Sequence, residues 1–488
     1  MSARDALAPS PAEPAPAPSP GPLLRGSGTT LTEQLARQLA ERIRQRLLPA
    51  GSRLPSVREA ARRHGVSPHT VVAAYDQLLA GGLVEARRQR GFFVREGGGS
   101  PARAGAGAAA VGRTPPVDAT ALIRGMFHGD TGQPAPGLGT LPADWLDGPL
   151  LTSALRRVMS RGDPTLALQY GHPAGDTRLR EALSRKLGDV GVRAEAGQIV
   201  TANGATQALD IVSRALLAPG DAVLVDEPGW AVEYARLTQL GMRLLPVPRG
   251  VDGPDLTVLA ALAAAHRPRL YVTVSVLHNP TGNSLTLAAA HQILKLAEQH
   301  DFQVVEDDTY AHLAPHHLPR MAALDGLQRT FYVSGFSKIL TPSWRVGYVA
   351  APLQRVERLI DVKLLSSLTT PALLEQGLAV CLEQGSLRRH AERVVSRLDA
   401  ARQRTVRLAE AHGCRFVTPP QGLFGWIDTG CDTQHLAERM HEAGWLLAPG
   451  HLFHASPRPG TLMRINFATS QDARFWRDFE VARRGLVG

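Results

Sequence analysis

A segment of small residues divides this chain of 488 residues. Residues 96–116 read EGGGSPARAGAGAAAVGRTPP and contain almost no large apolar side chain, a composition that is typical of a flexible linker. Residues 8–22 contain seven prolines and are typical of an extended or disordered tail. The chain is therefore expected to hold two folded domains. The predicted boundaries are a tail over 1–22, a small domain over 23–95, a linker over 96–117 and a large domain over 118–488.

The two predicted domains differ in charge. Residues 23–95 hold 13 arginines, no lysine and five acidic residues, so this segment carries +8 of the formal net charge of +10. A compact basic module beside a nearly neutral body favours a polyanionic partner for the module. A solvated, arginine-rich face has the same composition, so charge alone does not decide between the two.

Three further features bear on the compartment. No run approaches the roughly 18 uncharged apolar residues of a membrane span. The N-terminal segment has no apolar stretch after its first charges, so no secretory signal is expected. The three cysteines, Cys381, Cys414 and Cys431, are too few and too widely spaced for a disulfide framework or a zinc site. We therefore expect a cytoplasmic protein with no membrane partner.

The large domain alternates short valine-rich runs with helical patterns. Helical periodicity covers 205–217 and 287–300. Buried strands joined by helical crossovers predict a mostly parallel α/β sheet, and residues 372–488 predict a smaller α+β subdomain. The predicted strands are 198–202, 222–225, 270–276, 302–306, 330–335 and 346–350.

The basic module predicts three helices followed by a hairpin. Helical patterns cover 31–48, 56–65 and 67–82, and two short strands flank an arginine-rich turn at 87–91. Three helices and a basic hairpin form a winged helix-turn-helix, in which the third helix enters the major groove of DNA. The hairpin then reaches flanking phosphates or the minor groove.

The run from Leu48 to Val94 resembles the GntR family of winged-helix regulators. Relatives often carry arginine where this chain has Pro68 and Ala73, so fewer side chains are expected to read bases. The alternative is a helical trio used for protein contacts. The resemblance implies that double-stranded DNA is contacted by Arg58, Ser67, His69, Thr70, Arg90 and Gly91.

The chain has only four lysines. Lys186, Lys295 and Lys363 lie in helical patterns and are interpreted as solvated charges. Lys338 follows a buried strand in YVSGFSKILTPSWRVGY, at the strand end where α/β sheets bind ligands. Desolvation there lowers the pKa of the amine, and a neutral amine can bond covalently to an aldehyde.

Residues around Lys338 suit a phosphorylated pyridine aldehyde. The turn Gly204-Ala205-Thr206 offers backbone N–H groups and a helix N-terminus to a phosphate. Arg345 can grip the same phosphate with two hydrogen bonds, although it could equally be a surface arginine. Asp307, at the end of a strand, can hold a ring nitrogen protonated.

Three more residues complete this predicted site. Tyr310 and Asn279 can donate hydrogen bonds to the phenolic oxygen of such a ring, although Asn279 also suits an ordinary Asn-Pro turn. Trp230 can stack on the ring, although a tryptophan is more often part of a core.

The motifs HNPTG, DDTY and SGFSK, in that order, resemble the fold-type I, class I aminotransferases, which bind pyridoxal 5′-phosphate (PLP). The resemblance covers about 118–485. It implies that Lys338 bonds to PLP, that Asp307 binds the pyridine nitrogen, and that Tyr310 and Asn279 bind the phenolic oxygen. Thr206 and Arg345 then hold the phosphate.

The same resemblance implies two residues at the edges of the site. Tyr170 matches the tyrosine that reaches the phosphate of the neighbouring subunit, which implies a homodimer. Arg464 matches the arginine that grips the substrate carboxylate. One position departs from the pattern, because Gly335 stands where a serine or threonine usually helps to hold the phosphate. A neighbouring serine, Ser334 or Ser337, can substitute, or PLP is held more weakly.

A winged helix joined by a linker to an aminotransferase-like domain resembles the MocR subfamily of bacterial regulators. This implies a PLP-responsive transcription factor that senses PLP or the adduct of PLP with an amino compound. A working aminotransferase whose basic module only localises it to DNA remains an alternative, as does a PLP-binding structural dimer. The basic module favours the regulator, because an aminotransferase does not need it. The effector, the operator and the sign of regulation stay open.

Overall fold

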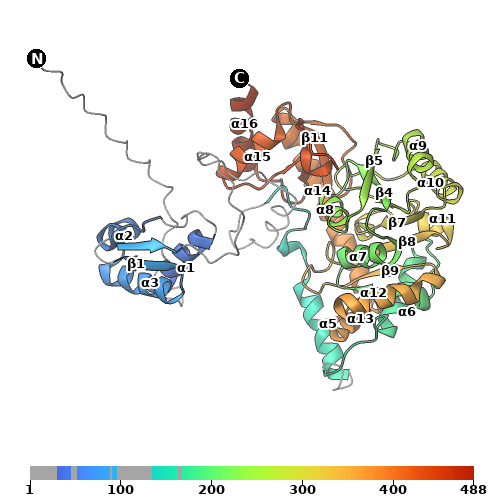
Figure 1. The fold of residues 1–488 in the computed structure, drawn as a ribbon, viewed down its shortest axis with the longest axis horizontal. Coiled ribbons are helices and arrows are strands. Elements are labelled where there is room, and N and C mark those ends of the chain that lie inside the picture. The colour runs from blue at the N-terminus through green and yellow to red at the C-terminus, as the bar shows by residue number, and fades with distance from the viewer. Residues whose placement is uncertain (1–29, 45–51, 88–90, 96–134, 162–167, 488) are drawn as a thin grey trace, which may run out of the picture. The chain divides into compact units, whose positions relative to one another are not determined.

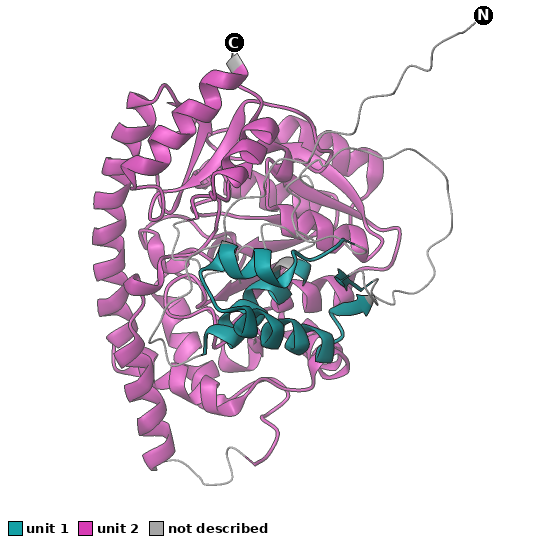
Figure 2. Cartoon of the chain, turned by 90° about the vertical axis from the view of Figure 1, so that its left-hand side faces the viewer, with its two compact units in different colours: residues 1–111 teal, residues 112–488 magenta. Residues whose placement is uncertain are grey.

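The computed structural model describes residues 30–44, 52–87, 91–95, 135–161 and 168–487. The chain forms two compact units, Met1–Val111 and Gly112–Gly488 (Figure 2). The boundary between the units falls within the segment that the sequence predicts to be a linker. The predicted tail and the linker themselves lie outside the described residues.

The first unit has the predicted winged helix-turn-helix fold. Its core is built from Leu35 and Leu39 of the first helix, Leu54, and Val71 and Tyr75 of the third helix. The elements are α1 (Leu31–Arg44), α2 (Val57–His64), α3 (Pro68–Ala80), β1 (Val84–Arg87) and β2 (Gly91–Val94).

Local sequence signals set the ends of these helices. The Ser67 hydroxyl accepts a hydrogen bond from the Thr70 backbone N–H at 3.1 Å and so caps α3. Gly65 ends α2 with a φ of 62°, a left-handed conformation that favours glycine. The Tyr75 hydroxyl donates to the Pro55 carbonyl at 2.9 Å, which ties α3 to the segment before α2.

A seven-stranded sheet forms the centre of the second unit. Strand β9 pairs antiparallel with both β3 and β8, and the other pairs are parallel, so the predicted mostly parallel α/β sheet is confirmed. The order across the sheet is β3 (Ile199–Ala202), β9 (Gly347–Ala350), β8 (Thr330–Gly335), β7 (Gln303–Asp307), β6 (Leu270–Thr273), β4 (Ala222–Glu227) and β5 (Arg243–Pro248).

Two strands differ from the prediction. Strand β5 is absent from it, because Pro246 and Pro248 argue against a strand; β5 lies at the sheet edge, where proline is tolerated. Strand β6 ends at Thr273 rather than at residue 276. The chain turns there into the loop that carries Asn279.

Helices cover both faces of the sheet (Figure 1). One face is covered by α7 (Ala205–Leu216), α8 (Ala231–Gln239) and α12 (Val356–Ser367). The other face is covered by α9 (Leu256–His266), α10 (Leu287–Gln299) and α11 (Met321–Asp325). Burial on both faces explains why the strands read as continuous apolar runs.

The C-terminal part adds the predicted α+β layer. The chain near residue 137 is hydrogen-bonded to this part. The Gly137 N–H donates to the Leu446 carbonyl at 2.8 Å, and the Asn466 N–H donates to the Pro136 carbonyl at 3.0 Å. The first C-terminal helix, α13 (Ala372–Glu383), packs instead on α5 (Gly148–Arg161) and α6 (Thr177–Gly188). The remaining elements are α14 (Ser386–Ala411), β10 (Arg415–Phe416), β11 (Phe424–Asp428), α15 (Thr433–Glu442), β12 (Ala448–Pro449), β13 (Leu462–Asn466) and α16 (Ala473–Val487).

Among the helices of the described ranges, none is both long and apolar enough to cross a membrane.

Candidate functional site

Lys338 and Arg464 face the same space beside Gly139. A Cβ atom added to Gly139 would lie 3.8 Å from both Lys338 Nζ and Arg464 Nη1. Burial, and after it the cations Arg464 and Arg345, lower the pKa of Lys338 to about 8, although Asp307 opposes them. A substantial share of the Lys338 amine is therefore neutral near pH 8, as a nucleophilic amine requires.

Asp307 and Tyr310 approach this space from the end of β7. Asp307 Oδ1 accepts hydrogen bonds from the Thr309 backbone N–H at 3.0 Å and from the Thr309 hydroxyl. Burial raises the pKa of Asp307 to about 6. Burial also raises the pKa of Tyr310, so its hydroxyl stays protonated, although its hydrogen bond with Asn279 acts in the opposite direction.

Arg464 enters from β13 and is buried, with 4% of its surface exposed. Its Nη1 donates to Asn279 Oδ1 at 2.7 Å and its Nη2 to the Gly137 carbonyl at 2.6 Å. The Arg464 Nε has no hydrogen-bond partner among the described residues. A buried guanidinium with a spare N–H beside a lysine suits the carboxylate of an amino acid.

The predicted phosphate contacts gather at the N-terminus of α7. Gly204 precedes this helix with a φ of 85°, and a Cβ there would collide with the Arg345 guanidinium. Arg345 Nη2 donates to the Asn203 carbonyl at 3.0 Å, and its Nη1 donates to Ser337 Oγ at 3.2 Å. Ala205 and Thr206 begin α7 beside them, so the positive end of the helix dipole and a guanidinium converge on one point.

Gly335 faces this phosphate site as well. A Cβ at Gly335 would lie 3.4 Å from the Ala205 backbone nitrogen. Ser334 is buried and its hydroxyl donates to the Asp308 carbonyl at 2.8 Å, away from Arg345. Of the two serines that the sequence offers as substitutes, Ser337 is therefore the one beside Arg345.

Trp230 ends the strand–helix connection before α8 and lines a small cavity. Asp307, Glu233, Thr273 and His278 line the same cavity, so the predicted stacking residue and the predicted ring-nitrogen partner face each other. A larger surface depression of about 720 Å³ runs along α14 and contains none of the predicted site residues.

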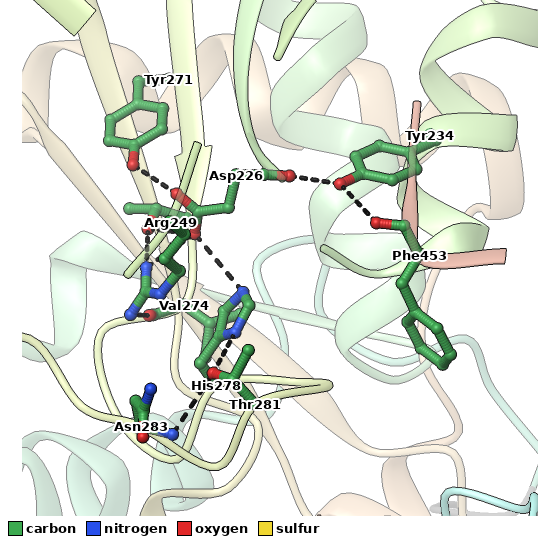
Figure 3. Close-up of polar contacts among 10 residues, drawn as sticks. Asp226, Tyr234, Arg249, Tyr271, Val274, His278, Thr281, Asn283 and Phe453 are labelled. Carbon is green, nitrogen blue, oxygen red and sulfur yellow. Dashed lines mark hydrogen bonds and ion pairs between the residues drawn. The ribbon is translucent and has the colours of Figure 1, made fainter. Parts of the chain in front are cut away.

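A buried polar network supports the wall of this cavity (Figure 3). The Asp226 carboxylate accepts hydrogen bonds from Tyr271 at 2.5 Å, Thr273 at 2.7 Å and Arg249 at 2.8 Å. His278 Nε2 lies 3.7 Å from Asp226 Oδ2. Burial and the nearby Arg249 hold the pKa of His278 well below its usual value, so its ring is neutral.

This network fixes the loop that carries Asn279. His278 Nδ1 lies within hydrogen-bond distance, 2.9 Å, of Thr281 Oγ1, and the His278 backbone N–H donates to Asn283 at 2.7 Å. Sequence reasoning missed the network, although the acidic residue at the end of β4, Asp226, signalled a polar group at the ligand-binding edge.

Tyr170 is the one predicted cofactor-site residue outside this cluster. Its side chain is 82% exposed, and the apolar side chains of Leu168 and Leu365 are also more than 80% exposed. That Tyr170 serves the site of a neighbouring subunit stays a prediction.

The interpretation of the other lysines is correct for two of the three. Lys186 pairs with Asp189 at 2.9 Å on the surface, and Lys295 is exposed. Lys363 is fully buried, so its interpretation as a solvated charge is wrong. Its Nζ donates to Thr201 Oγ1 at 3.2 Å, because α12 packs on β3, and burial lowers the pKa of Lys363 to about 8.

In the N-terminal unit the predicted DNA contacts are on the surface. Arg58 on α2 and His69 on α3 are exposed, and Thr70 is half-buried beside the capping Ser67. Gly91 begins β2 with a φ of 98°, as the tip of a tight turn requires. Arg90 lies outside the described residues.

One further exposed arginine, Arg53, lies beside Gly91. The Arg53 guanidinium packs against Gly91, since a Cβ there would lie 3.4 Å from Arg53 Nε. Arg53 was not predicted, although it follows Gly51-Ser52 in the run that resembles the GntR family.

Family comparisons match both units. The family "Aminotransferase class I and II" matches residues 139–475, and "Bacterial regulatory proteins, gntR family" matches residues 31–94.

Similar proteins span both matched regions. The chain is 25% identical over 466 residues to the HTH-type transcriptional regulator YisV of Bacillus subtilis, covering 92% of this chain and 94% of that protein. It is 29% identical over 459 residues to the probable rhizopine catabolism regulatory protein MocR of Rhizobium meliloti, covering 88% and 89%.

A solved structure matches the second unit. It is LysN, the α-aminoadipate aminotransferase of Thermus thermophilus, in complex with N-(5′-phosphopyridoxyl)-L-leucine. The similarity has a TM-score of 0.69 and 26% identity, and covers 75% of this chain and 95% of LysN.

Proposed function

Because this chain belongs to the class I and II aminotransferase family and carries a gntR-family domain, we propose that it is a transcriptional regulator that binds DNA and senses PLP or its compound with an amino compound. The observation that carries the proposal is the presence in one chain of an exposed basic winged helix and a half-buried lysine with lowered pKa.

The described residues fit PLP. Lys338 has the partly neutral amine that a covalent bond to the aldehyde requires, and the space beside Gly139 separates it from Arg464. When bound, PLP supplies an aldehyde for amines and a ring that withdraws electrons from them. The phosphate would be held by Ser337, Arg345 and the first turn of α7.

The other residues of the site orient the ring and the amino compound. The Asp307 carboxylate would accept a hydrogen bond from the protonated ring nitrogen, Tyr310 and Asn279 would donate to the phenolic oxygen, and Trp230 would stack on the ring. Arg464 binds a carboxylate of the amino compound through its spare Nε and by exchanging its contact with the Gly137 carbonyl.

The active form is a homodimer on double-stranded DNA in the cytoplasm, where the chromosome lies. The exposure of Tyr170, which makes no contact with the described site of its own chain, supports the dimer. Two DNA-binding units then read two half-sites, with Arg58, Arg90 and Gly91 at the backbone and His69 and Thr70 at the bases.

A second candidate is a working aminotransferase. The observation in its favour is that Lys338, Asp307 and Arg464 all occupy positions that the chemistry needs. It predicts that amino acids exchange their amino group with a keto acid at a rate that operator DNA does not change.

The decisive experiment measures operator binding by fluorescence anisotropy with no ligand, with PLP, and with PLP plus each of a panel of amino compounds. We expect one amino compound to change DNA affinity by roughly 5- to 150-fold. Deleting residues 1–95 should abolish binding. Unchanged affinity under all ligands, with transamination turnover present, would favour the second candidate instead.

A further inference from the structure

A second carboxylate, Glu233, lines the cavity that also holds Asp307, the predicted partner of the ring nitrogen. Glu233 sits in the first turn of α8, three residues after Trp230, and only 5% of its surface is exposed. It lines the same cavity as Asp307 and Trp230. None of the roles assigned above uses this buried acid.

Glu233 is held by a cation on the side of α7. Arg236 Nε donates to Glu233 Oε2 at 3.1 Å, and Arg236 Nη2 donates to Oε1 at 2.5 Å. Arg236 also donates to Ser213 at 3.0 Å and pairs with Asp210 at 3.5 Å, both on α7. A line of alternating charges therefore runs from the cavity through Glu233 and Arg236 to Asp210, which is partly exposed.

Several groups act on the Asp307 carboxyl. Burial raises its pKa most, Thr309 opposes this by donating hydrogen bonds, and the charges of Glu233 and Asp308 raise the pKa further. Lys338 is the cation that interacts with Asp307 across the site, and the Tyr310 hydroxyl also faces it.

The two neighbouring acids are compensated differently. Asp308 accepts from Arg320 at 2.8 Å and from the Tyr332 hydroxyl at 2.8 Å, all buried beneath the sheet end. Both oxygens of Glu233 accept from Arg236, but Glu233 lines the cavity next to Asp307, whereas neither Asp308 nor Arg236 is part of its lining. Glu233 is thus the acid placed to act on whatever occupies the cavity next to Asp307.

We propose that Glu233 is a positioning residue that sets the proton affinity of Asp307 and of the ring nitrogen that Asp307 binds. The proposal rests on the proposed function, since it needs a cofactor with such a nitrogen. A negative charge beside a carboxyl and a nitrogen that share a proton holds the proton to higher pH. Glu233 thereby keeps the ring protonated, while Arg236 limits how strongly it does so.

The test uses full-length protein and measures the dissociation constant of PLP between pH 5 and 8. Binding requires ionised Asp307, so affinity falls as the pH drops through the Asp307 pKa of about 6. Free PLP titrates in the same way with every variant, so differences in the midpoint between variants report on the protein alone. A second readout is the ¹⁵N NMR shift of PLP labelled at the ring nitrogen, followed against pH.

Two variants should act in opposite directions. Glu233→Gln keeps the size of the side chain and removes the charge, and should move both midpoints to lower pH by about half to one unit. Arg236→Gln leaves the Glu233 charge uncompensated, and should move both midpoints upward. Glu233→Asp keeps the charge and should stay near the wild type.

Asp210→Asn is the matched control at the exposed end of the line and should shift the midpoints least. Equal midpoints in all variants, or shifts of Glu233→Gln and Arg236→Gln in the same direction, would overturn the proposal. If Glu233→Gln does not fold, the sign of the Arg236→Gln shift still decides. Wild-type protein that fails to bind PLP at all would refute the proposed function rather than this inference.

Discussion

The N-terminal unit displays its functional charges, and the large unit buries them. Arg53, Arg58 and His69 are exposed. In the large unit, 5% or less of Arg464, Lys363 and Glu233 is exposed. An exposed charge acts through its sign, so counting arginines in a sequence predicts what it binds. A buried charge takes its chemistry from its partners, which counting does not reveal.

The largest expected effect tests the buried side of this comparison. Lys338→Ala should lose the visible absorbance band of bound PLP completely, because no other amine in the described site can bond to the aldehyde. Borohydride reduction followed by peptide mapping should place the cofactor on Lys338 in the wild type. Lys295→Ala, which changes an exposed lysine, should keep the band. An adduct on Lys363 would show that Lys363, and not Lys338, bonds to the cofactor.

The second prediction concerns Lys363, the buried lysine outside the site. Its pKa is lowered from 10.5 to about 8, so the folded state binds fewer protons than the unfolded state between those values. The free energy of unfolding should therefore rise with pH across that window, by roughly 3 kcal/mol relative to Lys363→Met. Urea unfolding at pH 7.5, 9 and 10 measures the difference.

Lys295→Met is the matched control for an exposed lysine and should show no such pH dependence. A difference between wild type and Lys363→Met that stays constant from pH 7.5 to 10 would mean that Lys363 is solvated after all.

The third prediction tests the exposed side. Arg58→Ala should weaken operator binding roughly tenfold and reduce the slope of log K against log[salt] by about 0.9 per DNA-binding unit. Arg388→Ala removes an arginine of the large unit whose side chain is 70% exposed, and should leave both quantities unchanged. Equal losses for the two variants would indicate that net charge, not position, determines DNA binding.

Part of the fold and of the site could be predicted from the sequence. The order of HNPTG, DDTY and SGFSK predicted that Asn279, Asp307 and Lys338 lie at or after strand ends, because strand periodicity and turn motifs are local signals. In the structure Asp307 ends β7, while Asn279 and Lys338 lie in the segments that follow β6 and β8. Membership in the class I and II aminotransferase family is confirmed, and residues 31–94 match the gntR family. By contrast, β5 was missed because its prolines are tolerated only at a sheet edge, and edge position depends on the whole topology.

Side-chain partners were the least predictable part. Sequence could not choose between Ser334 and Ser337, and the choice follows from the Ser334 contact with Asp308. It also placed Lys363 in solvent, since a helix pattern does not show that its polar residue faces β3. The role of Glu233 could not be predicted for the same reason, because its position relative to Asp307 and Arg236 is set by the folded structure.

The smallest expected effect concerns Gly335. A serine there would carry its hydroxyl to the phosphate site beside Ala205, and its Cβ would meet neighbours at 3.4 Å, within ordinary contact. Gly335→Ser should tighten PLP binding roughly threefold, the lower end of what one added hydrogen bond contributes, because the new side chain also has to fit among close neighbours. Ser337→Ala should loosen it, because Ser337 supports Arg345. If Gly335→Ser weakens PLP binding, crowding outweighs the added hydroxyl.

The central claim is that the buried site and the exposed DNA-binding surface are thermodynamically coupled. The most direct measurement is reciprocal. The dissociation constant of the amino compound is determined by isothermal titration of PLP-loaded protein with and without operator DNA. Linkage predicts the same factor, roughly 5- to 150-fold, that the amino compound imposes on DNA affinity. Identical dissociation constants with and without DNA, for every amino compound that binds, would contradict the account.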